Sequence, residues 1–143
     1  NALMHIPAIA HEFGINLDAD TFDRMHRGAH YLLDIRPAGR FPAQYFYYAG
    51  GVPRVMEALQ KDLNLDALTC TGKTLGENIR DHIYLYPSCD NNVIRPVDQP
   101  FSTLGGIAIM RGNLAPNTGV AKPAAIAEQV RRFSGEAICF DIE

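Results

Sequence analysis

Apolar side chains recur at helical spacing over the first part of the chain. At intervals of three and four residues stand Leu3, Ile6, Ala10 and Phe13. This spacing predicts a helix over residues 1–13 with one apolar face. Pro7 lies within the pattern, so it marks either a kink or the true first turn. Gly14 suits the position just past the end of this helix.

Two more helices are expected before residue 64. Asp18 or Asp20 can cap a helix that runs to about His26 and stops at Gly28. The inward-facing side chains of this helix would be Phe22 and Met25. Pro53 suits the first turn of a third helix. The buried face of that helix would carry Val55, Leu59 and Leu63.

Extended and irregular pieces separate and follow these helices. Residues 31–35 form a short apolar run, and residues 41–48 are rich in aromatic side chains before Gly50-Gly51 breaks the chain. Later strands are expected at 67–71, 107–110, from Val120 onward and at 137–140, with short helices over 72–80 and 124–133. The remainder would be a surface connection over 86–103, extended at Val93-Ile94, and a turn cluster over 113–119. The chain thus divides near residue 64 into a helical part and a β-rich part.

Composition excludes several classes of protein. The chain has 143 residues, a net charge of -3 and no dense basic cluster, so no electrostatic case exists for nucleic acid. No apolar run approaches the roughly 18 residues that a membrane span needs. Three scattered cysteines suit a reducing cytoplasm better than a disulfide framework. Because the chain begins with Asn1 and at once with a helical pattern, we expect it to be part of a longer polypeptide.

Thr71-Gly72-Lys73-Thr74 resembles the end of a phosphate-binding loop. Such a loop needs a glycine five residues before the Gly-Lys pair, where this chain has Ala67. A strand-to-helix turn with a solvated Lys73 is the simpler interpretation. A third is that Thr71 and Lys73 line a pocket for an anionic substrate.

Other polar residues have structural and functional interpretations. His26 and His30 are four apart but lack a third ligand, so surface histidines are favoured. His5 lies near the apolar face of its helix, where a hydrogen-bonded core histidine is expected. Cys70 would be a packed residue of a buried strand. The segment Arg111 to Pro116 is either a simple turn or a loop that offers the Asn113 side chain to a ligand, with Lys122 just beyond.

A series of short motifs runs along the whole chain. After the first ten residues come Phe22-Asp23-Arg24, Arg36 to Arg40, Ala49 to Pro53, Thr71 to Asn78, Val93 to Pro96, Gly105 to Ala108, Arg111 to Pro116 and Val120 to Lys122. In this order they resemble the dihydroxy-acid and phosphogluconate dehydratase family. The aromatic run Tyr45 to Tyr48 is more similar to the family's sugar-acid branch, of arabinonate or xylonate dehydratases, than to the branched-chain biosynthetic branch.

The resemblance implies an α/β fold, which is α+β over this stretch. Residues 1–64 would be the helical C-terminal part of an N-terminal α/β domain. Residues 65–143 would be the first part of a C-terminal domain similar to the swivelling β-barrel of aconitase-like enzymes. A piece of such an assembly would expose apolar surface, so the chain by itself should aggregate or be only marginally folded.

The activity implied by the resemblance is that of an iron–sulfur hydro-lyase. It would remove water from a 2,3-dihydroxy carboxylate, in this branch an aldonic sugar acid, and give a 2-keto-3-deoxy acid. The C2 proton is weakly acidic and hydroxide is a poor leaving group, so the reaction needs a base, a cation such as Mg²⁺ and an electrophilic iron. The resemblance places the catalytic residues and the cluster and magnesium ligands outside these residues. Cys70, Cys89 and Cys139 match no cluster ligand.

The residues expected nearest the substrate cleft offer polar contacts and positive charge to a carboxylate and hydroxyls. They are His5, Thr71, Lys73, Asn113 and Lys122. The resemblance also implies a small sugar-acid substrate, a cytoplasmic location and a dimer or tetramer, without nucleic-acid or membrane partners. Three alternatives remain open. They are a branched-chain dihydroxy-acid dehydratase, a non-catalytic module that binds a small anion without metal, and an ATP-binding domain, against which Ala67 argues.

Overall fold

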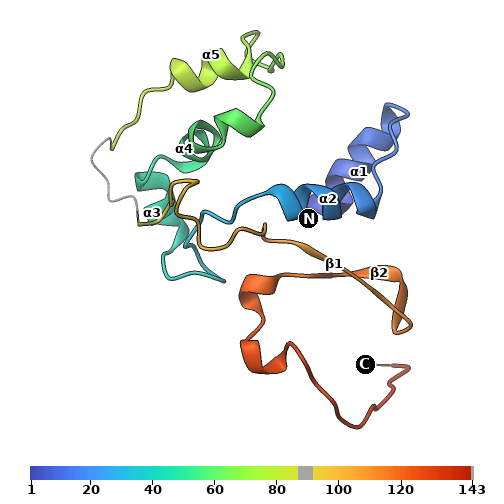
Figure 1. Cartoon of the computed structure of the whole chain (residues 1–143). Helices are drawn as coiled ribbons and strands as arrows, with labels where there is room; N and C mark the ends of the chain where they lie inside the picture. The colour runs from blue at the N-terminus through green and yellow to red at the C-terminus, as the bar shows by residue number, and fades with distance from the viewer. Residues whose placement is uncertain (87–91, 143) are drawn as a thin grey trace.

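The computed structural model describes residues 1–86 and 92–142, as a set of short elements around a small centre (Figure 1). The helices are α1 Ala2–Glu12, α2 Ala19–Gly28, α3 Ala43–Tyr48, α4 Gly51–Ala58 and α5 Leu75–Arg80. The strands are β1 Ala108–Gly112 and β2 Ala115–Ala121, and the 3-10 turns are η1 Gln60–Asp62, η2 Pro123–Ala125 and η3 Glu128–Val130. Helices with one small antiparallel sheet agree with the α+β class. Among the described helices, none has the length and apolar character needed to cross a membrane.

The end of α1 confirms the role expected for Gly14. This glycine has a φ of 70°, the left-handed conformation that an ordinary side chain disfavours. The amide of Gly14 donates to the carbonyl of His11, and the amide of Ile15 donates to that of Ala10, both at 2.9 Å. These two bonds satisfy carbonyls that the last helical turn leaves free. Pro7 lies inside the helix and not at its first turn.

Helix α2 is capped by Asp18, the first of the two expected candidates. Its carboxylate accepts a hydrogen bond from the amide of Thr21 at 2.8 Å. The helix ends at Gly28, as expected. The interpretation of Met25 as an inward-facing residue was wrong, because its side chain is 67% exposed.

The aromatic stretch forms a helix that the sequence pattern did not predict. It becomes α3, and α4 follows directly, beginning at Gly51, so Pro53 lies in the first turn of α4 as expected. Gly50 makes the junction with a φ of 105°. Helix α4 ends at Ala58, so Leu63 falls after the turn η1 and not on the helix. The expected third helix therefore exists with Pro53 in its first turn, but it ends earlier than its apolar spacing indicated.

The core lies where the extended run 31–35 meets residues from much later in the chain. Leu33 bridges Ile94, and Tyr31 bridges Ser102, both in antiparallel fashion. Val93 and Ile94 are 3% and 4% exposed, among the most buried residues of the structure. They pack with Ala49, Leu33, Ile35, Phe41, Phe46 and Val55. The expectation of a surface connection over 86–103 was therefore wrong for Val93-Ile94, although the expected extended form is confirmed at Ile94, which makes a bridge. Residues 87–91 lie outside the described part.

A buried carboxylate fixes the loop that follows this run. Asp34 is 6% exposed and accepts hydrogen bonds from the amide of Arg40 at 2.8 Å and from its Nε at 2.5 Å. Burial raises the pKa of Asp34, but the hydrogen bonds from Arg40 outweigh it and hold the pKa below 3.8. Gly39 lies against Asp34 so closely that a Cβ there would stand 2.3 Å from the Asp34 carbonyl carbon.

The strands β1 and β2 form a hairpin. Ala108 pairs with Ala121 at its open end, and Gly112 pairs with Ala115 at its tip, so only residues 113–114 make the turn. The turn cluster expected over 113–119 was therefore wrong, because β2 begins before Pro116 and runs through it. A two-stranded hairpin tolerates proline because each strand has a free edge that requires no amide. The strand expected over 107–110 is confirmed as β1.

The hairpin is attached to α2 through His26. The imidazole Nδ1 of His26 accepts a hydrogen bond from the amide of Ile107 at 3.1 Å, and its carbonyl accepts one from the amide of Gly105 at 3.0 Å. Arg111 of β1 also pairs with Asp20 of α2. The interpretation of His26 as a surface histidine was thus wrong, since the ring is half-buried and joins two elements.

Two strands expected in the second half do not form. Over 67–71 only Leu68 makes a bridge, to Thr74, and the interpretation of Cys70 as a packed strand residue was wrong because it is exposed. Residues 137–140 pair with no strand in the described part, and Phe140 is 83% exposed. Both segments have strand-like composition, but a strand needs a neighbour to satisfy its amides and carbonyls.

The helix expected over 124–133 was also wrong. Only the single turns η2 and η3 form there, each closed by bonds such as that from the Val130 amide to the Ala127 carbonyl at 3.1 Å. A helix of this length is marginal unless its apolar face packs against another element. Val130 and Phe133 are 54% and 82% exposed, so that packing is missing in the described residues. The division near residue 64 stays a prediction.

The structure exposes far more surface than a compact protein of its size. Its accessible area is 11287 Å², whereas a compact monomer of 15.8 kDa exposes about 7,300 Å². The large exposed apolar side chains include Met4, Ile9, Phe13, Ile83, Leu114, Phe133, Ile138, Phe140 and Ile142. Hydrophobic burial drives folding in proportion to the area removed from water. The chain by itself therefore has a weak driving force to fold.

We expect the purified chain to unfold without a sharp transition. Scanning calorimetry should give a broad melt whose enthalpy lies well below the roughly 0.7 kcal/mol per residue of compact domains. The exposed apolar side chains should also make the chain self-associate as its concentration rises. A monomer that melts in one narrow transition with the full enthalpy would contradict this expectation.

The substitution Gly39→Ala should destabilise the protein. The added Cβ would meet the backbone of Asp34 and Ile35 at 2.3 and 2.4 Å, and backbone atoms cannot move aside cheaply. Measured on the polypeptide that carries the chain, the urea midpoint should fall by an amount that corresponds to about 1–3 kcal/mol. Gly28→Ala is the matched control, because a Cβ there meets nothing within 4 Å. Equal midpoints for the two variants would show that the Asp34 loop can relax.

Candidate functional site

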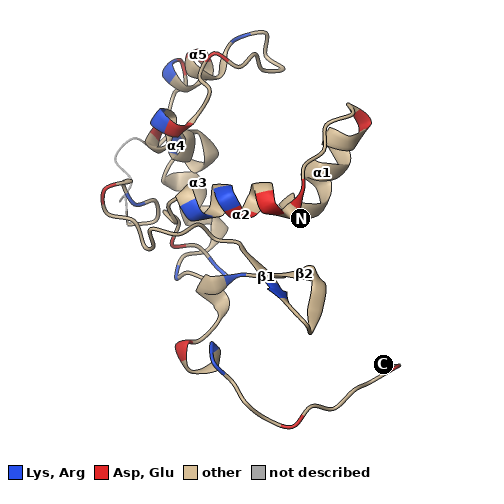
Figure 2. Cartoon of the chain, turned by 45° about the vertical axis from the view of Figure 1, so that its right-hand side comes forward, with Lys and Arg blue, Asp and Glu red and all other residues tan. Residues whose placement is uncertain are grey.

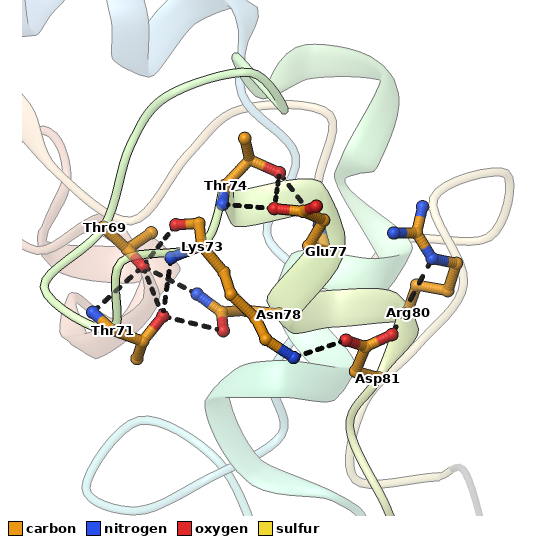
Figure 3. Close-up of polar contacts among 8 residues, drawn as sticks. All are labelled: Thr69, Thr71, Lys73, Thr74, Glu77, Asn78, Arg80 and Asp81. Atoms are coloured by element: carbon orange, nitrogen blue, oxygen red, sulfur yellow. Dashed lines mark hydrogen bonds and ion pairs between the residues drawn. The ribbon is translucent and has the colours of Figure 1, made fainter.

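The turn before α5 brings together two of the five residues expected near a substrate (Figure 3). The hydroxyl of Thr71 donates to Oδ1 of Asn78 at 3.0 Å, and Nδ2 of Asn78 donates to the hydroxyl of Thr69 at 2.7 Å. Thr69 also donates to the carbonyl of Lys73 at 2.8 Å. One asparagine on α5 thus holds Thr69 and Thr71, and these two threonines in turn hold the backbone of Lys73.

The amides of this turn are already used within it. The amide of Thr71 donates to the hydroxyl of Thr69, the amide of Gly72 to the carbonyl of Thr69, and the amide of Lys73 to the hydroxyl of Thr71. A phosphate-binding loop instead leaves such amides free to point at the phosphate oxygens. The geometry therefore gives no support to a nucleotide-phosphate site at Gly72-Lys73-Thr74.

Lys73 is paired and not freely solvated. Its ammonium lies 2.7 Å from a carboxylate oxygen of Asp81, and Arg80 lies 3.8 Å from the other oxygen. The hydrogen bond from Lys73 lowers the pKa of Asp81, and the same bond raises the pKa of Lys73. Both side chains are about half exposed, so the ammonium keeps donors that face solvent.

A capping box fixes the start of α5, the short helix expected within residues 72–80. The amide of Glu77 donates to the hydroxyl of Thr74 at 3.2 Å, and the amide of Thr74 donates to the Glu77 carboxylate at 2.8 Å. The hydrogen bond from the Thr74 amide is the main cause of the lowered pKa of Glu77. The turn and the helix are therefore a single rigid unit.

A polar cleft of 710 Å³ lies between α4 and α5. Its lining includes Glu57, Asp66, Glu77, Arg80, His82 and Tyr84. The Tyr84 hydroxyl donates to Glu57 at 2.9 Å, and Arg54 pairs with the same carboxylate oxygen at 2.6 Å while stacking on the Tyr84 ring at 3.8 Å. Burial is the main cause that raises the pKa of Tyr84, and the hydrogen bond to the Glu57 carboxylate raises it further. Sequence analysis missed this cluster, because no short-range pattern links Glu57 to Tyr84.

The other three expected residues lie elsewhere. His5 is exposed on α1, so its interpretation as a core histidine was wrong. Asn113 is exposed at the tip of the β1–β2 hairpin, and Lys122 is exposed just after β2. The hairpin is well separated from α5 (Figure 1). The described residues thus place the five candidates in three regions, and their role in a substrate cleft stays a prediction.

The described residues contain no evident metal centre. Within 1–86 and 92–142, no three His, Cys, Asp or Glu side chains converge on one point. Cys70 and Cys139 are exposed and unpaired, and Cys89 lies outside the described part. These donors do not fit an iron–sulfur cluster or a Mg²⁺ ion. Basic and acidic side chains are interspersed along α2, α4 and α5, without a region of one sign (Figure 2).

Comparisons with known proteins give one consistent result. Residues 1–78 match the family described as "Dihydroxy-acid/6-phosphogluconate dehydratase N-terminal", and residues 92–143 match its C-terminal counterpart. Among curated relatives, a dihydroxy-acid dehydratase of Methanosarcina barkeri is 41% identical over 143 residues, which are 100% of this chain and 26% of the relative. An L-arabonate dehydratase of Azospirillum brasilense is 42% identical over 144 residues, 99% of this chain and 24% of the relative. The chain spans about a quarter of the length of the curated relatives it matches.

The Lys73–Asp81 pair predicts a pH response that can be measured. Because the folded-state pKa of Asp81 is lowered, the pair contributes stability above the ordinary value of 3.8 and loses it as pH falls through the folded pKa. We expect Lys73→Met to return the pKa of Asp81 toward 3.8 in an NMR titration of its carboxyl carbon. Lys122→Met, at an exposed lysine outside the turn, should leave that titration unchanged. A similar titration of Asp81 in all three proteins would contradict the pairing.

Proposed function

Because the chain belongs to the dihydroxy-acid/6-phosphogluconate dehydratase family, we propose that the polypeptide carrying it removes water from a 2,3-dihydroxy carboxylate. The observation that carries this proposal is the pair of family matches, N-terminal then C-terminal, in order along one chain. The relatives that align over nearly its whole length bear dehydratase names. Because it spans about a quarter of their length, the proposal concerns the activity of the whole polypeptide.

The proposed reaction breaks two bonds and keeps the carbon chain. The C2 proton leaves to a base, the C3 hydroxyl leaves as water after gaining a proton, and the resulting enol becomes a 2-keto acid. Negative charge grows on the substrate as the C2 proton departs, so positive groups and hydrogen-bond donors near the carboxylate favour the reaction. We propose this supporting role for His5, Thr71, Lys73, Asn113 and Lys122. None of them is proposed as the base or as a metal ligand.

Lys73 is the best placed of these residues to attract an anion. Asp81 occupies one of its donors, and the half-exposed ammonium has two more. Asn78 holds the adjacent Thr71 in the same turn. This arrangement would orient the lysine while leaving charge available, which supports attraction of a carboxylate and not proton transfer.

We propose an aldonic sugar acid as the substrate and a branched-chain dihydroxy acid as the alternative. Both kinds of name occur among the relatives, L-arabonate dehydratase and dihydroxy-acid dehydratase. The aromatic run favours the sugar acid. Its rings pack together, with the Tyr48 ring 6.3 Å from that of Tyr45 and 6.0 Å from that of Tyr47, and such rings can stack on the C–H faces of a sugar chain.

The rest of the proposal concerns groups outside the described residues. An iron–sulfur cluster and Mg²⁺ would supply the electrophile and the cation that this chemistry needs when bound. No described residue is assigned as a ligand of either. We also propose a cytoplasmic homodimer or homotetramer that acts on a small-molecule substrate.

The test is a dehydration assay on the polypeptide that carries the chain, with L-arabinonate and 2,3-dihydroxyisovalerate as paired substrates. We expect 2-keto acid to form, and faster from L-arabinonate. Lys73→Ala and Asn113→Ala should each lower kcat/KM by roughly tenfold, the loss of one hydrogen bond to a charged group. Arg132→Ala, at an exposed residue of the C-terminal stretch, is the matched control. No keto acid from either substrate would refute the function, and unchanged kcat/KM in both variants would refute the residue roles.

A further inference from the structure

The contact between α2 and the β1–β2 hairpin depends on one imidazole nitrogen. Nδ1 of His26 accepts the hydrogen bond from the Ile107 amide at 3.1 Å, just before β1 begins. A Cβ added at Gly105 would stand 3.0 Å from the same nitrogen, so the backbone that leads into β1 lies directly against the ring. An imidazole nitrogen accepts a hydrogen bond only while it carries no proton. The contact therefore requires a neutral His26 whose proton is on Nε2.

Protonation of the ring removes this contact. Both nitrogens of a charged imidazole are donors, so Nδ1 would present its own N–H to the N–H of Ile107. Two donors repel each other, and a backbone amide without an acceptor costs free energy where water is partly excluded. Histidine side chains ordinarily change charge near about pH 6.5. The contact with Ile107 thus holds at neutral pH and is lost as the pH falls and the ring gains its second proton.

The charged groups around His26 offer the protonated ring another partner. On α2 they are Asp20, Asp23 and Arg27, and on β1 the charged group is Arg111. Asp20 is paired with Arg111. Asp23 stands three residues before His26, a spacing that makes side chains neighbours on a helix. Arg27 binds Oδ2 of Asp23 at 2.8 Å, and a carboxylate can accept further hydrogen bonds.

The electrostatic surroundings of Asp23 agree with this placement. The hydrogen bond from Arg27 is the main cause that lowers the pKa of Asp23, and the charges of His26 and Arg111 lower it further. Asp23 is therefore ionised at the pH where an imidazole gains its proton. A protonated His26 would be drawn toward this carboxylate and away from the Ile107 amide.

The other contacts between α2 and the hairpin do not titrate near neutral pH. The carbonyl of His26 accepts from the Gly105 amide at 3.0 Å, and neither group changes charge. The Asp20 and Arg111 side chains are 62% and 53% exposed, and exposed ion pairs contribute little to stability. The Gly105 bond keeps the chain beside α2, while the imidazole bond alone makes the attachment of β1 depend on pH.

We propose that His26 is a pH-sensitive latch, which holds Ile107 when neutral and turns to Asp23 when protonated. Opening the latch releases the start of β1 from α2, with Gly105 as the remaining tether. The hairpin carries Asn113 at its tip and is followed by Lys122, so the positions of both would follow the latch. That last consequence rests on the proposed function, whereas the latch itself does not.

The test is hydrogen–deuterium exchange of the Ile107 amide in the polypeptide that carries the chain, without substrate. It is measured at about pH 7.5 and about pH 5.5, one unit on each side of the ordinary imidazole value. After correction for the intrinsic exchange rate, we expect the protection of Ile107 to fall by roughly tenfold at the lower pH, the loss of one hydrogen bond. The amide of Arg95, bonded to the Leu32 carbonyl at 2.8 Å, is the internal reference and should keep its protection. Unchanged protection of Ile107, or an equal fall at Arg95, would overturn the proposal.

Variants of His26 separate the latch from a structural role. His26→Asn places an amide oxygen on the same Cγ, so it can accept from Ile107 but cannot titrate, and protection should stay high at both pH values. His26→Leu has no acceptor and should leave Ile107 weakly protected at both. His11→Asn, at an exposed histidine of α1, is the matched control and should respond to pH as the unmodified protein does. A fall in the His26→Asn variant as large as in the unmodified protein would refute the latch.

The role of Asp23 is tested separately. Asp23→Asn removes the charge that attracts the protonated ring, so the loss of Ile107 protection should become several-fold smaller at about pH 5.5. A full response in this variant would refute the exchange of partners. Because exchange is measured without turnover, its outcome and that of the dehydration assay are independent.

Discussion

The carboxylate of Asp34 is the contact on which the middle of the molecule depends. A buried carboxylate is costly unless hydrogen bonds and an opposite charge compensate for lost water. Here the amide and guanidinium of Arg40 supply both, which folds residues 36–40 back over the strand run. The backbone of Asp34 also pairs on both sides, with the carbonyl of Val93 and the amide of Phe41. One residue thus joins three stretches of chain.

The parts of the fold that follow from local chemistry could be predicted from the sequence. Gly14 marks the end of α1 and Asp18 marks the start of α2, through hydrogen bonds between residues no more than five positions apart. Thr74 marks the start of α5 in the same way. Strands were less predictable, because a strand exists only where a neighbour satisfies its backbone. Residues 137–140 have strand-like composition but no such neighbour in the described part, whereas residues 115–119 pair despite Pro116.

The candidate site also has a part that follows from local sequence and a part that depends on the fold. Sequence motifs located Thr71 and Lys73 in one turn, and that turn is real. The motifs did not show that Asn78 and Asp81 hold those side chains, because that depends on the exact start of α5. The contact of His26 with Ile107 and the link of Tyr84 to Glu57 both join residues far apart in sequence. No short pattern marks such pairs, and only the fold reveals them.

The bridge between Leu33 and Ile94 has a consequence for how the chain assembles. It closes a loop of roughly sixty residues, and closing a loop of that length costs entropy before any contact rewards it. The capped helices can form early and locally, whereas this bridge can form only when the whole segment between Leu33 and Ile94 has brought its two ends together. The residues on either side of the bridge lie next to each other, so α3 to α5 behave as an insertion between two bridged segments. Insertions or deletions in this segment could therefore change its length without changing how the bridged residues pair.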